Sequence, residues 1–190
     1  MRISAGSAKG RKVILNKSLL GSKTEDNLRP TSAKVRQALF NILYDKVSGS
    51  DFLDLYSGTG AVGLESLSRG AAHVVFVERN QARFKAIRTM VERFGFADRT
   101  EVVKDDVLRF LKVEEREFDI IFIDPPYDYD DTDEVFELIG LKDLLKDSGV
   151  VVWEHSSRKS SPAEFGKLKH FRSYRYGDTA LSIYSKGENK

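Results

Sequence analysis

The sequence of 190 residues contains no cysteine, which excludes a disulfide framework, a thiolate metal site and a cysteine nucleophile. It also lacks any apolar run near the roughly 18 residues that a membrane-spanning helix needs, and Met1–Gly6 holds no apolar signal-peptide core. The three histidines, His73, His155 and His170, lie far apart and show no paired spacing typical of a metal site. We therefore expect a cytoplasmic protein without a bound metal, and we interpret His155 as structural.

Proline is scarce as well: the chain has four, and two of them are adjacent at positions 125 and 126. Hydrophobic residues make up 41% of the chain and are spread along its whole length. A chain of this length can bury one well-formed core and is short for two ordinary domains. Composition therefore predicts one globular unit rather than a disordered chain.

The net charge of +2 hides an uneven distribution of charge along the chain. Residues 1–46 carry ten Lys/Arg against three Asp/Glu, and residues 158–190 carry eight against three. Residues 47–157 carry thirteen against twenty-three. Two basic segments that flank an acidic body favour a nucleic-acid ligand, although basic end segments can also be solvated without binding anything.

Hydrophobic periodicity predicts an α/β fold, because short apolar runs alternate with helical spacing. Strands are expected at 52–56, 74–77, 101–103, 118–123 and 150–153, and helices at 33–46, 61–69, 79–94, 107–111 and 135–145. Continuous apolar strands of this kind indicate a parallel sheet that is covered on both faces. Runs at 169–175 and 180–185 flank the turn signal Tyr176–Thr179 and predict a closing antiparallel hairpin.

The predicted organisation has three parts. Residues 1–30 form an extension with a β-hairpin, whose short strands Arg2-Ile3 and Val13–Leu15 flank a basic loop that contains glycine. Residues 31–186 form a Rossmann-like domain with a mostly parallel, seven-stranded sheet. Residues 187–190 are expected to be a disordered tail.

A glycine-rich loop, Gly58-Thr59-Gly60-Ala61-Val62-Gly63, follows a predicted strand and opens a helix, as in nucleotide-binding α/β folds. Glu78 ends the next strand, where its carboxylate could accept both ribose hydroxyls of an adenosine. These features alone fit NAD as well as S-adenosylmethionine. An ordinary βα turn with glycines for packing is the plainer alternative.

Two sets of carboxylates favour S-adenosylmethionine. Asp54 lies just before the glycine loop, where it would attract the cationic amino acid end of that cofactor and repel a pyrophosphate. Asp105-Asp106 ends the third strand, and Asp106 could accept from an adenine amino group while the backbone at Val107 meets the ring edge. The alternative is a helix N-cap, and both roles can hold together.

Asp124-Pro125-Pro126-Tyr127 follows the strand that we expect near the centre of the sheet, where ligands of α/β folds bind. Prolines have no N–H and a restricted φ, so the carbonyls of this motif point in fixed directions. The Asp124 carboxylate and the Pro125 carbonyl could each accept one hydrogen of an exocyclic amino group, while Tyr127 stacks on the base. A paired base would first have to be flipped out. The alternative is a stiff turn after a strand.

Over nearly its whole length the sequence resembles the RsmD-type bacterial 16S rRNA (guanine-N2)-methyltransferases. The segments that carry the resemblance are Met1–Gly6, Lys9–Arg11, Arg29–Thr31, Val35–Leu43, Asp54–Glu65, Ser68–Ala71, Asp124–Tyr127, Glu154-His155 and Tyr176–Leu181. It implies a monomeric S-adenosylmethionine-dependent methyltransferase of Rossmann-like fold, with a small N-terminal hairpin. It also implies a substrate, the N2 amino group of one guanine in the rRNA of the small ribosomal subunit or an assembly intermediate.

The resemblance further implies which residues act. Its catalytic motif corresponds to Asp124, Pro125, Pro126 and Tyr127, and its cofactor positions correspond to Asp54, Gly58, Gly60, Glu78 and Asp106, to which we add the neighbours Ser57, Arg79 and Val107. The chain departs from the family at Lys104, where a glycine commonly precedes the aspartate, so either Asp105 or Asp106 could meet adenine. Charge and position make a further set candidate RNA contacts: Arg2, Lys9, Arg11, Lys12, Arg29, Thr31, Lys34 and Arg36. A solvated helix face is the alternative for this set.

Three other functions stay open at this stage. A DNA adenine-N6 or cytosine-N4 methyltransferase shares the Asp124–Tyr127 motif but needs a target-recognition segment, and no large insertion is expected here. An NAD-dependent oxidoreductase would leave that motif unexplained, and a non-catalytic RNA-binding module would have no use for it. The motif itself does not distinguish guanine N2 from adenine N6; only the resemblance does.

Overall fold

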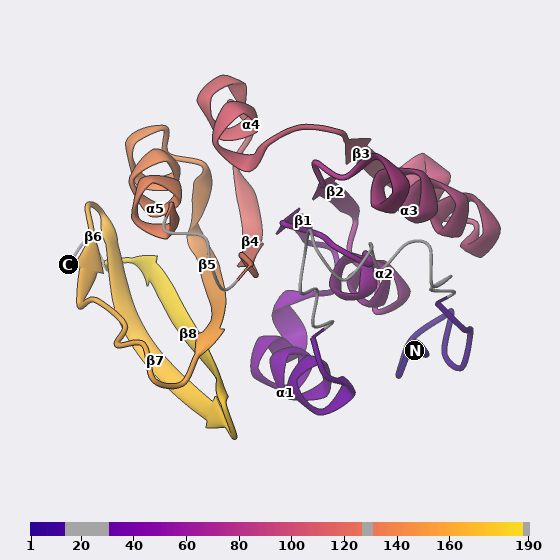
Figure 1. Cartoon of the computed structure of the whole chain (residues 1–190), viewed down its shortest axis with the longest axis horizontal. Helices are drawn as coiled ribbons and strands as arrows, with labels where there is room; N and C mark the ends of the chain where they lie inside the picture. The colour runs from indigo at the N-terminus through magenta and orange to yellow at the C-terminus, as the bar shows by residue number, and fades with distance from the viewer. Residues whose placement is uncertain (14–30, 127–130, 188–190) are drawn as a thin grey trace.

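The computed structural model describes residues 1–13, 31–126 and 131–187, and it is built around one sheet with helices on both faces (Figure 1). The sheet has the strand order β3-β2-β1-β4-β5-β8-β7-β6. Its parallel strands are β1 (Asp51–Leu55), β2 (His73–Val77), β3 (Thr100–Val103), β4 (Phe118–Ile123) and β5 (Leu145–Ser156). Its antiparallel strands are β6 (Glu164–Phe165), β7 (Leu168–Tyr176) and β8 (Thr179–Lys186). The seven predicted strands are therefore confirmed, and the two-residue β6 extends the edge.

The helices cover the sheet in two layers because side chains alternate between its faces. In β1, Phe52 belongs to one buried cluster with α1 (Ala33–Leu43), α2 (Ala61–Ser68) and α3 (Gln81–Phe94). Leu53 and Leu55 belong to a second cluster with α4 (Val107–Val113) and α5 (Thr132–Leu141). Figure 1 shows α4 and α5 on the side of the sheet opposite α1 and α2. Two single-turn 3-10 helices, η2 (Tyr44–Lys46) and η3 (Ala97–Arg99), complete the connections.

One predicted boundary is wrong: the helix expected over 135–145 begins earlier and ends earlier, as α5. Asp143 has a φ of +58°, a left-handed conformation that stops a helix. Leu144 and Leu145 are then fully buried in the second cluster, and Leu145 pairs with Phe118 of β4. Leu144 thus connects the two elements and Leu145 starts a long strand, although both leucines resemble a helical continuation in the sequence.

The sheet brings distant parts of the chain to one edge. The carboxyl ends of β1, β2, β3, β4 and β5 lie together because these strands are parallel. The strand order reverses between β1 and β4, since the chain runs outward from β1 through β2 to β3 and then returns to β4. Such a reversal is where open α/β sheets bind ligands. Within the described residues, no helix combines the length and the apolarity that crossing a bilayer requires.

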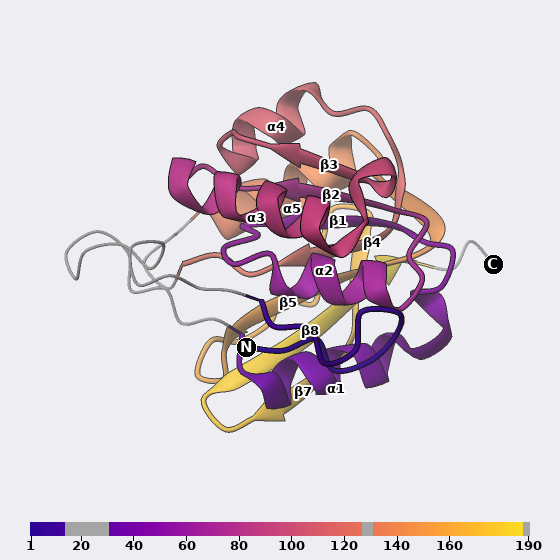
Figure 2. The same cartoon turned by 90° about the vertical axis from the view of Figure 1, so that its right-hand side faces the viewer.

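The N-terminal segment forms the predicted turn but only one isolated bridge, between Arg2 and Lys12, rather than two strands. It lies across α1 and α2 (Figure 2). Its backbone is attached to the end of α2, because Ser7 donates to the Ser68 carbonyl at 2.8 Å and Ala8 donates to the Ser68 hydroxyl at 2.9 Å. Gly6 makes this approach possible: its φ is +80°, and a Cβ there would lie 1.8 Å from the Ser68 carbonyl oxygen. The predicted strand residues Ile14-Leu15 fall outside the described residues.

A buried ion pair holds the N-terminal segment, α1 and α2 together. Glu65 is fully buried, and its carboxylate accepts from Arg36 Nε at 3.3 Å, from Arg69 Nε at 3.1 Å and from the Ser4 backbone N–H at 3.0 Å. Arg36 is 2% exposed and also donates to the Arg2 carbonyl at 2.9 Å. Removing one partner of a buried pair leaves the other charge unsolvated, which destabilises strongly.

Replacing Glu65 tests this network. We expect Glu65→Ala to lower the free energy of unfolding by about 3–5 kcal/mol, because Arg36 is left buried without its carboxylate. Glu137→Ala is the matched control, since Glu137 is exposed on α5, and it is expected to change stability by less than about 0.5 kcal/mol. Urea unfolding measures both variants. Equal losses in the two would contradict the structural role of the Glu65 network.

Candidate active site

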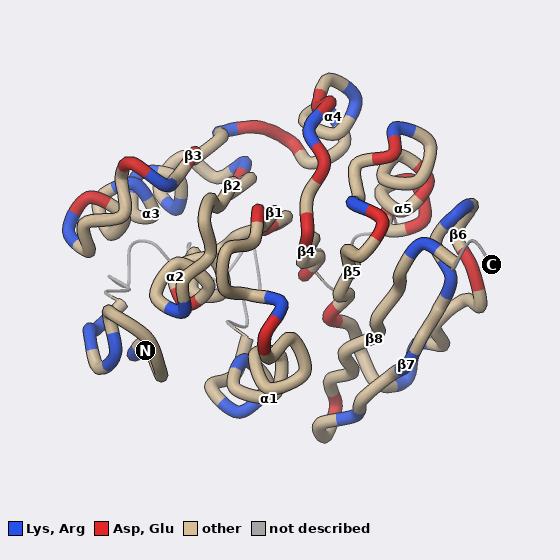
Figure 3. Tube along the Cα trace, turned by 180° about the vertical axis from the view of Figure 1, so that it is seen from behind, with Lys and Arg blue, Asp and Glu red and all other residues tan. Residues whose placement is uncertain are grey.

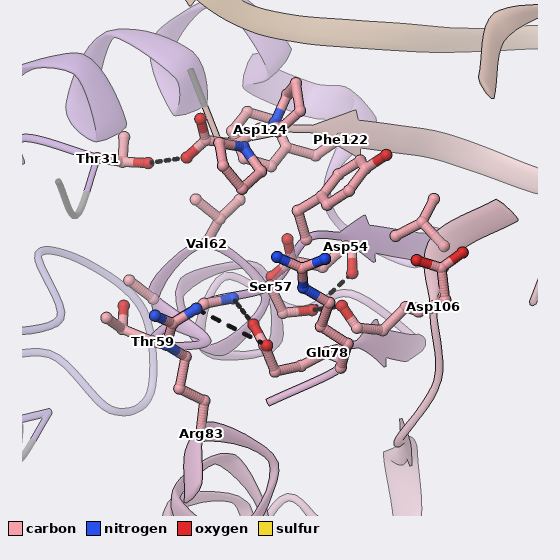
Figure 4. Close-up of a pocket in the computed structure, with 18 of the residues that line it drawn as sticks. Thr31, Asp54, Ser57, Thr59, Val62, Glu78, Arg83, Asp106, Phe122 and Asp124 are labelled. Carbon is pink, nitrogen blue, oxygen red and sulfur yellow. Dashed lines mark hydrogen bonds and ion pairs between the residues drawn. The ribbon is translucent and has the colours of Figure 1, made fainter. Parts of the chain in front are cut away.

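A cavity of about 890 Å³ lies at the edge of the sheet where the strand order reverses. Figure 4 shows its walls, with Thr31 and Asp124 facing each other on one side and Glu78 and Asp106 farther along. It is lined by Thr31, Asp54, Tyr56, Ser57, Gly58, Thr59, Ala61, Val62, Val77, Glu78, Arg79, Arg83, Asp105, Asp106, Val107, Phe122, Asp124, Pro125 and Pro126. The structure thus brings together the two motifs that the sequence singled out, which are about sixty positions apart. We call this space the first cavity.

The glycine loop takes its shape from left-handed backbone conformations. Gly58 and Gly60 have φ of +53° and +70°, and the Gly60 N–H donates to the Ser57 carbonyl at 2.7 Å. Gly63 has a packing role instead, because a Cβ there would lie 2.2 Å from the Phe76 ring and 3.0 Å from Asp54 Oδ2. The first two glycines form the turn, and the third lets α2 approach β2 closely.

Asp54 is the most strongly perturbed carboxyl in the first cavity. It is 2% exposed, and its Oδ2 accepts the Gly63 N–H at 3.0 Å. Burial, and then the negative charges of Asp124 and Glu78, raise its pKa to about 8, against the lowering effect of the Gly63 hydrogen bond. A cationic ligand in this place would favour the ionised carboxylate.

Glu78 is engaged with the backbone around the glycine loop. Its Oε2 accepts from the Gly58 N–H at 2.8 Å, and its Oε1 accepts from the Asn80 N–H at 2.7 Å. Arg83 Nη1 lies 3.8 Å from Oε1. These contacts hold the Glu78 carboxylate in a fixed orientation beside the glycine loop.

Asp106 is the N-cap of α4, as the plainer sequence interpretation proposed. Its Oδ1 accepts from the backbone N–H groups of Leu108 at 3.0 Å and Arg109 at 3.4 Å. Asp105 is paired differently: its Oδ1 accepts from the Asp106 N–H at 2.8 Å and lies 2.9 Å from Arg109 Nη2. Both aspartates line the first cavity. Asp106 is therefore held in place by the helix that it caps, whereas Asp105 is tied to an arginine.

Asp124 forms a small polar cluster with Thr31 and Glu154. The Thr31 hydroxyl lies 3.2 Å from Asp124 Oδ2 and 3.1 Å from Glu154 Oε2. One hydroxyl supplies one hydrogen, so two carboxyl groups share a single donor. Burial raises the pKa of Asp124 to about 7, and burial together with the Asp124 charge raises the pKa of Glu154 to about 9. Within the described parts of the chain, no second side-chain donor reaches these two carboxyl groups, and a ligand could provide further donors.

A second cavity of about 420 Å³ adjoins the same motif. It is lined by Asp124, Pro125, Pro126, Thr132, Trp153, Glu154, His155, Ser156 and Lys159. Asp124, Pro125 and Pro126 line both cavities and therefore lie between them. His155 itself is fixed by the protein, because its ring nitrogens lie 2.9 Å from the Ser156 carbonyl and 2.7 Å from the Ser182 hydroxyl.

The candidate RNA contacts are distributed differently from the prediction. Arg2, Lys9, Arg11, Lys12 and Lys34 are exposed. Arg36 is a correction, since its guanidinium is buried against Glu65 and is not available to a phosphate. Thr31 is also buried, where it bridges Asp124 and Glu154. Arg29 and Tyr127 lie outside the described residues.

The sequence did not identify Glu154 as a site residue, and it indicated Thr31 only as an RNA contact. It also gave no indication that Arg83 and Phe122 line the first cavity. One signal could have found Glu154. Carboxylates stand at or just beyond the ends of the other parallel strands, at Asp54, Glu78, Asp106 and Asp124, and Glu154 lies near the end of β5 in the same way. For Thr31 no local signal exists, because its partners are 93 and 123 positions away.

The comparisons with known proteins agree with this geometry. The family described as Conserved hypothetical protein 95 matches residues 1–185. The chain is 33% identical over 189 residues to YlbH of Bacillus subtilis, which is named as a proposed rRNA methyltransferase; the match covers 98% of this chain and 99% of that one. It is 28% identical over 186 residues to the ribosomal RNA small subunit methyltransferase D of Escherichia coli, with 98% and 90% covered.

A solved structure is similar over the same length. The protein yhhF from Escherichia coli, titled as a proposed methyltransferase, superimposes with a TM-score of 0.83 at 28% identity, covering 98% of this chain and 97% of that one. The likeness therefore includes the N-terminal turn and the antiparallel strands as well as the parallel sheet.

The pKa of Asp54 leads to a prediction about ligand binding. Since that pKa is about 8, the ionised fraction rises up to about tenfold per pH unit below it. We expect S-adenosylhomocysteine, whose amino acid end carries an ammonium group, to bind more tightly as the pH rises from about 6 to about 7.5. Calorimetric titration should show this trend and a release of protons. Asp54→Asn should weaken binding and flatten the trend, whereas Asp98→Asn, at an exposed aspartate, should leave both unchanged.

The packing of Gly63 gives a second prediction. We expect Gly63→Ala to lower the free energy of unfolding by about 1–3 kcal/mol and to weaken S-adenosylhomocysteine binding, because the new methyl group must displace the Phe76 ring or Asp54. Gly140→Ala is the matched control: Gly140 is also helical, but its Cβ would have only ordinary contacts at 3.6 Å or more. This control should be neutral or stabilising. If Gly63→Ala left both the stability and the binding unchanged, the close approach of α2 to β2 would be refuted.

Proposed function

The chain belongs to the family described as Conserved hypothetical protein 95, and from this membership and the geometry of the site we propose that it transfers a methyl group from S-adenosylmethionine to the N2 amino group of a guanine in small-subunit rRNA. Its methyltransferase relatives support the reaction, and the relative named for the small ribosomal subunit supports the RNA. The choice of guanine N2 rests on the family resemblance of the sequence.

One observation carries the proposal: Asp124, Pro125 and Pro126 line two adjoining cavities. The first cavity, with its glycine loop and acidic walls, suits the methyl donor. The second cavity suits the acceptor base. A group held at Asp124 is therefore next to both reactants, which is the arrangement that a direct transfer requires.

The residues of the first cavity fit S-adenosylmethionine better than a dinucleotide. Burial, and then the negative charges of Asp124 and Glu78, raise the pKa of Asp54, and a pyrophosphate would add further negative charge to this space. A cation would relieve the crowding. Asp54 would face the amino acid end, Glu78 the ribose hydroxyls, and Asp106 the adenine amino group through the oxygen that does not cap α4. When bound, this cofactor supplies an electrophilic methyl group on a sulfonium.

Asp124 and Pro125 would prepare the acceptor amino group. An exocyclic amine on a base is a poor nucleophile because its lone pair is delocalised into the ring. Hydrogen bonds from its two hydrogens to the Asp124 carboxylate and the Pro125 carbonyl would favour a pyramidal nitrogen. With a pKa of about 7, Asp124 can also accept the proton that the nitrogen loses as the new N–C bond forms.

Basic surfaces on β7 and on the N-terminal turn suit the rRNA. In Figure 3 blue segments recur along β7 and the N-terminal turn. On β7, Lys169, Arg172 and Arg175 are exposed, and Arg172 lies over the rings of Phe171 and Tyr174 at 5.8 and 5.9 Å. Basic and aromatic side chains that alternate in this way can contact phosphates and stack on bases. The turn after β7 reaches the edge of the site, where Ser157 donates to the Asp178 carbonyl at 2.8 Å.

The other functions fit less well. The described parts of the chain contain no inserted unit of the size expected for DNA target recognition, and the curated relatives are named for rRNA. An NAD-dependent oxidoreductase conflicts with the acidic first cavity. A non-catalytic RNA-binding module would leave the two-cavity arrangement around Asp124 without a purpose.

Methyl transfer from labelled S-adenosylmethionine tests the function. Small ribosomal subunits, free rRNA of the small subunit and duplex DNA are offered in parallel, and mass spectrometry of the digested product identifies the methylated nucleoside and its position. We expect N2-methylguanosine in the subunit or the rRNA and no label in DNA. Label confined to DNA, or a methylated adenosine, would refute the proposal. Binding of NAD in place of S-adenosylhomocysteine would refute the cofactor.

The role of Asp124 gives a separate prediction. Asp124→Asn should lower kcat by about 10²–10⁴-fold, because the variant can neither accept the proton nor attract the amino hydrogens with a full charge. Affinity for S-adenosylhomocysteine should change little, since Asp54, Glu78 and Asp106 remain. For the wild-type protein kcat/KM should rise with pH through about 7, as Asp124 ionises. Near-normal kcat in Asp124→Asn would remove Asp124 from the mechanism.

A further inference from the structure

We propose that Glu154 selects guanine by accepting the ring N1–H of the base that occupies the second cavity. The inference deepens the proposed function and rests on it. It adds to the Asp124 motif a residue that reads the identity of the base, a task that the motif cannot perform alone. Any exocyclic amine could be held by Asp124 and Pro125, so discrimination must come from the neighbouring ring atom.

Glu154 lies where such a group is needed. It comes from β5, the strand next to β4, and it lines the second cavity beside Asp124 and Pro125. Glu154 is not one of the described residues that line the first cavity. Its carboxylate and that of Asp124 are both within hydrogen-bond reach of the single Thr31 hydroxyl, at 3.1 and 3.2 Å. A base that reaches Asp124 with its amino group therefore presents its adjacent ring atom near Glu154.

Among the residues that the structure describes, the Thr31 hydroxyl is the one side-chain donor to Glu154 and Asp124. Two carboxyl groups, buried or partly buried, share one hydroxyl hydrogen; burial raises the pKa of Asp124, and burial together with the charge of Asp124 raises the pKa of Glu154. Buried acceptors that lack donors are costly, and a ligand that supplies donors removes this cost. The site thus favours a molecule whose edge carries several N–H groups in a row.

Among the bases with an exocyclic amine, guanine has that edge. Its N1–H and the two hydrogens of its N2 amino group are three adjacent donors. In adenine the ring atom next to the amine, N1, is an acceptor, and in cytosine the corresponding N3 is also an acceptor. Either ring nitrogen would place its lone pair against the Glu154 oxygen that accepts the N1–H of guanine. A site built to hydrogen-bond one group discriminates strongly against analogues that lack it.

A single-atom change in the substrate tests the inference. Small subunits are reconstituted with rRNA that carries either guanine or 2,6-diaminopurine at the position mapped in the methylation assay. Diaminopurine keeps the 2-amino group but has an acceptor at N1. We expect the wild-type protein to prefer guanine by at least about 10- to 100-fold in kcat/KM, the factor expected when one buried hydrogen-bonding group is left unpaired. Equal rates on the two substrates would overturn the proposal without any variant.

Glu154→Gln supplies the second arm, because its amide can donate a hydrogen bond to an N1 acceptor. The guanine-to-diaminopurine ratio should fall by about 10- to 100-fold relative to wild type. The two bases also differ at position 6, where guanine has an oxygen and diaminopurine has an amino group. This difference affects the wild-type protein and Glu154→Gln equally, so it cancels when their ratios are compared. A variant that keeps the full wild-type ratio would overturn the role of Glu154.

Two controls distinguish a loss of base selection from a loss of cofactor binding or of stability. Affinity for S-adenosylhomocysteine and the melting temperature should not fall in Glu154→Gln, since Glu154 lies outside the first cavity wall and an uncharged amide replaces a buried carboxyl. Glu164→Gln, at an exposed glutamate of β6, should behave as wild type throughout. If the wild-type protein methylates no guanine, the proposed function fails; if it does and Glu154→Gln is indifferent, only the present inference fails.

Discussion

Acidic side chains at the ends of four neighbouring strands, crowded at one edge of the sheet, are the constraint on which the rest of the structure depends. Asp54, Glu78, Asp124 and Glu154 come from β1, β2, β4 and β5 or the residues just after them, and three of the four are buried. Among the described residues, backbone N–H groups at the glycine loop and the Thr31 hydroxyl donate to them, and Arg83 lies 3.8 Å from Glu78. The arrangement makes sense if ligands bring the missing positive charge and N–H groups.

This crowding lowers the stability of the unliganded protein at neutral pH. Carboxyl groups lose their protons near pH 4 in an unfolded chain, whereas Asp124, Asp54 and Glu154 have pKa values of about 7, 8 and 9 in the folded one. Between these values the folded state binds more protons, so raising the pH favours unfolding. Stability has to come from elsewhere, and the two apolar clusters on either face of the sheet, together with the buried Glu65–Arg36 pair, supply it. A strained site on a well-packed scaffold is the usual compromise between activity and stability.

Much of the fold and of the site could be predicted from the sequence because their signals are local. Apolar runs and helical spacing located the strands and helices, and the two motifs indicated both halves of the active site before their proximity was known. The misjudged residues are those whose roles depend on distant partners. Arg36 has the charge and helical position of an RNA contact, yet Glu65 neutralises it in the core. Leu144 and Leu145 have the spacing of a helix, yet α5 ends before the left-handed Asp143 and β5 begins at Leu145.

By itself the sequence determined the class of reaction. Its two signals are an Asp-Pro-Pro-Tyr motif after an apolar strand and an acidic residue before a glycine loop. Each of them consists of neighbouring residues, so each can be read without knowledge of the fold. Only the tertiary structure decided which groups share the space around the Asp-Pro-Pro-Tyr motif. Thr31 is 93 positions from Asp124 and 123 from Glu154, and no periodicity links them. They meet because parallel strands direct their carboxyl ends to one edge and because α1 begins beside it. Burial and shared donors, which set the charge of each group, exist only once that edge is assembled.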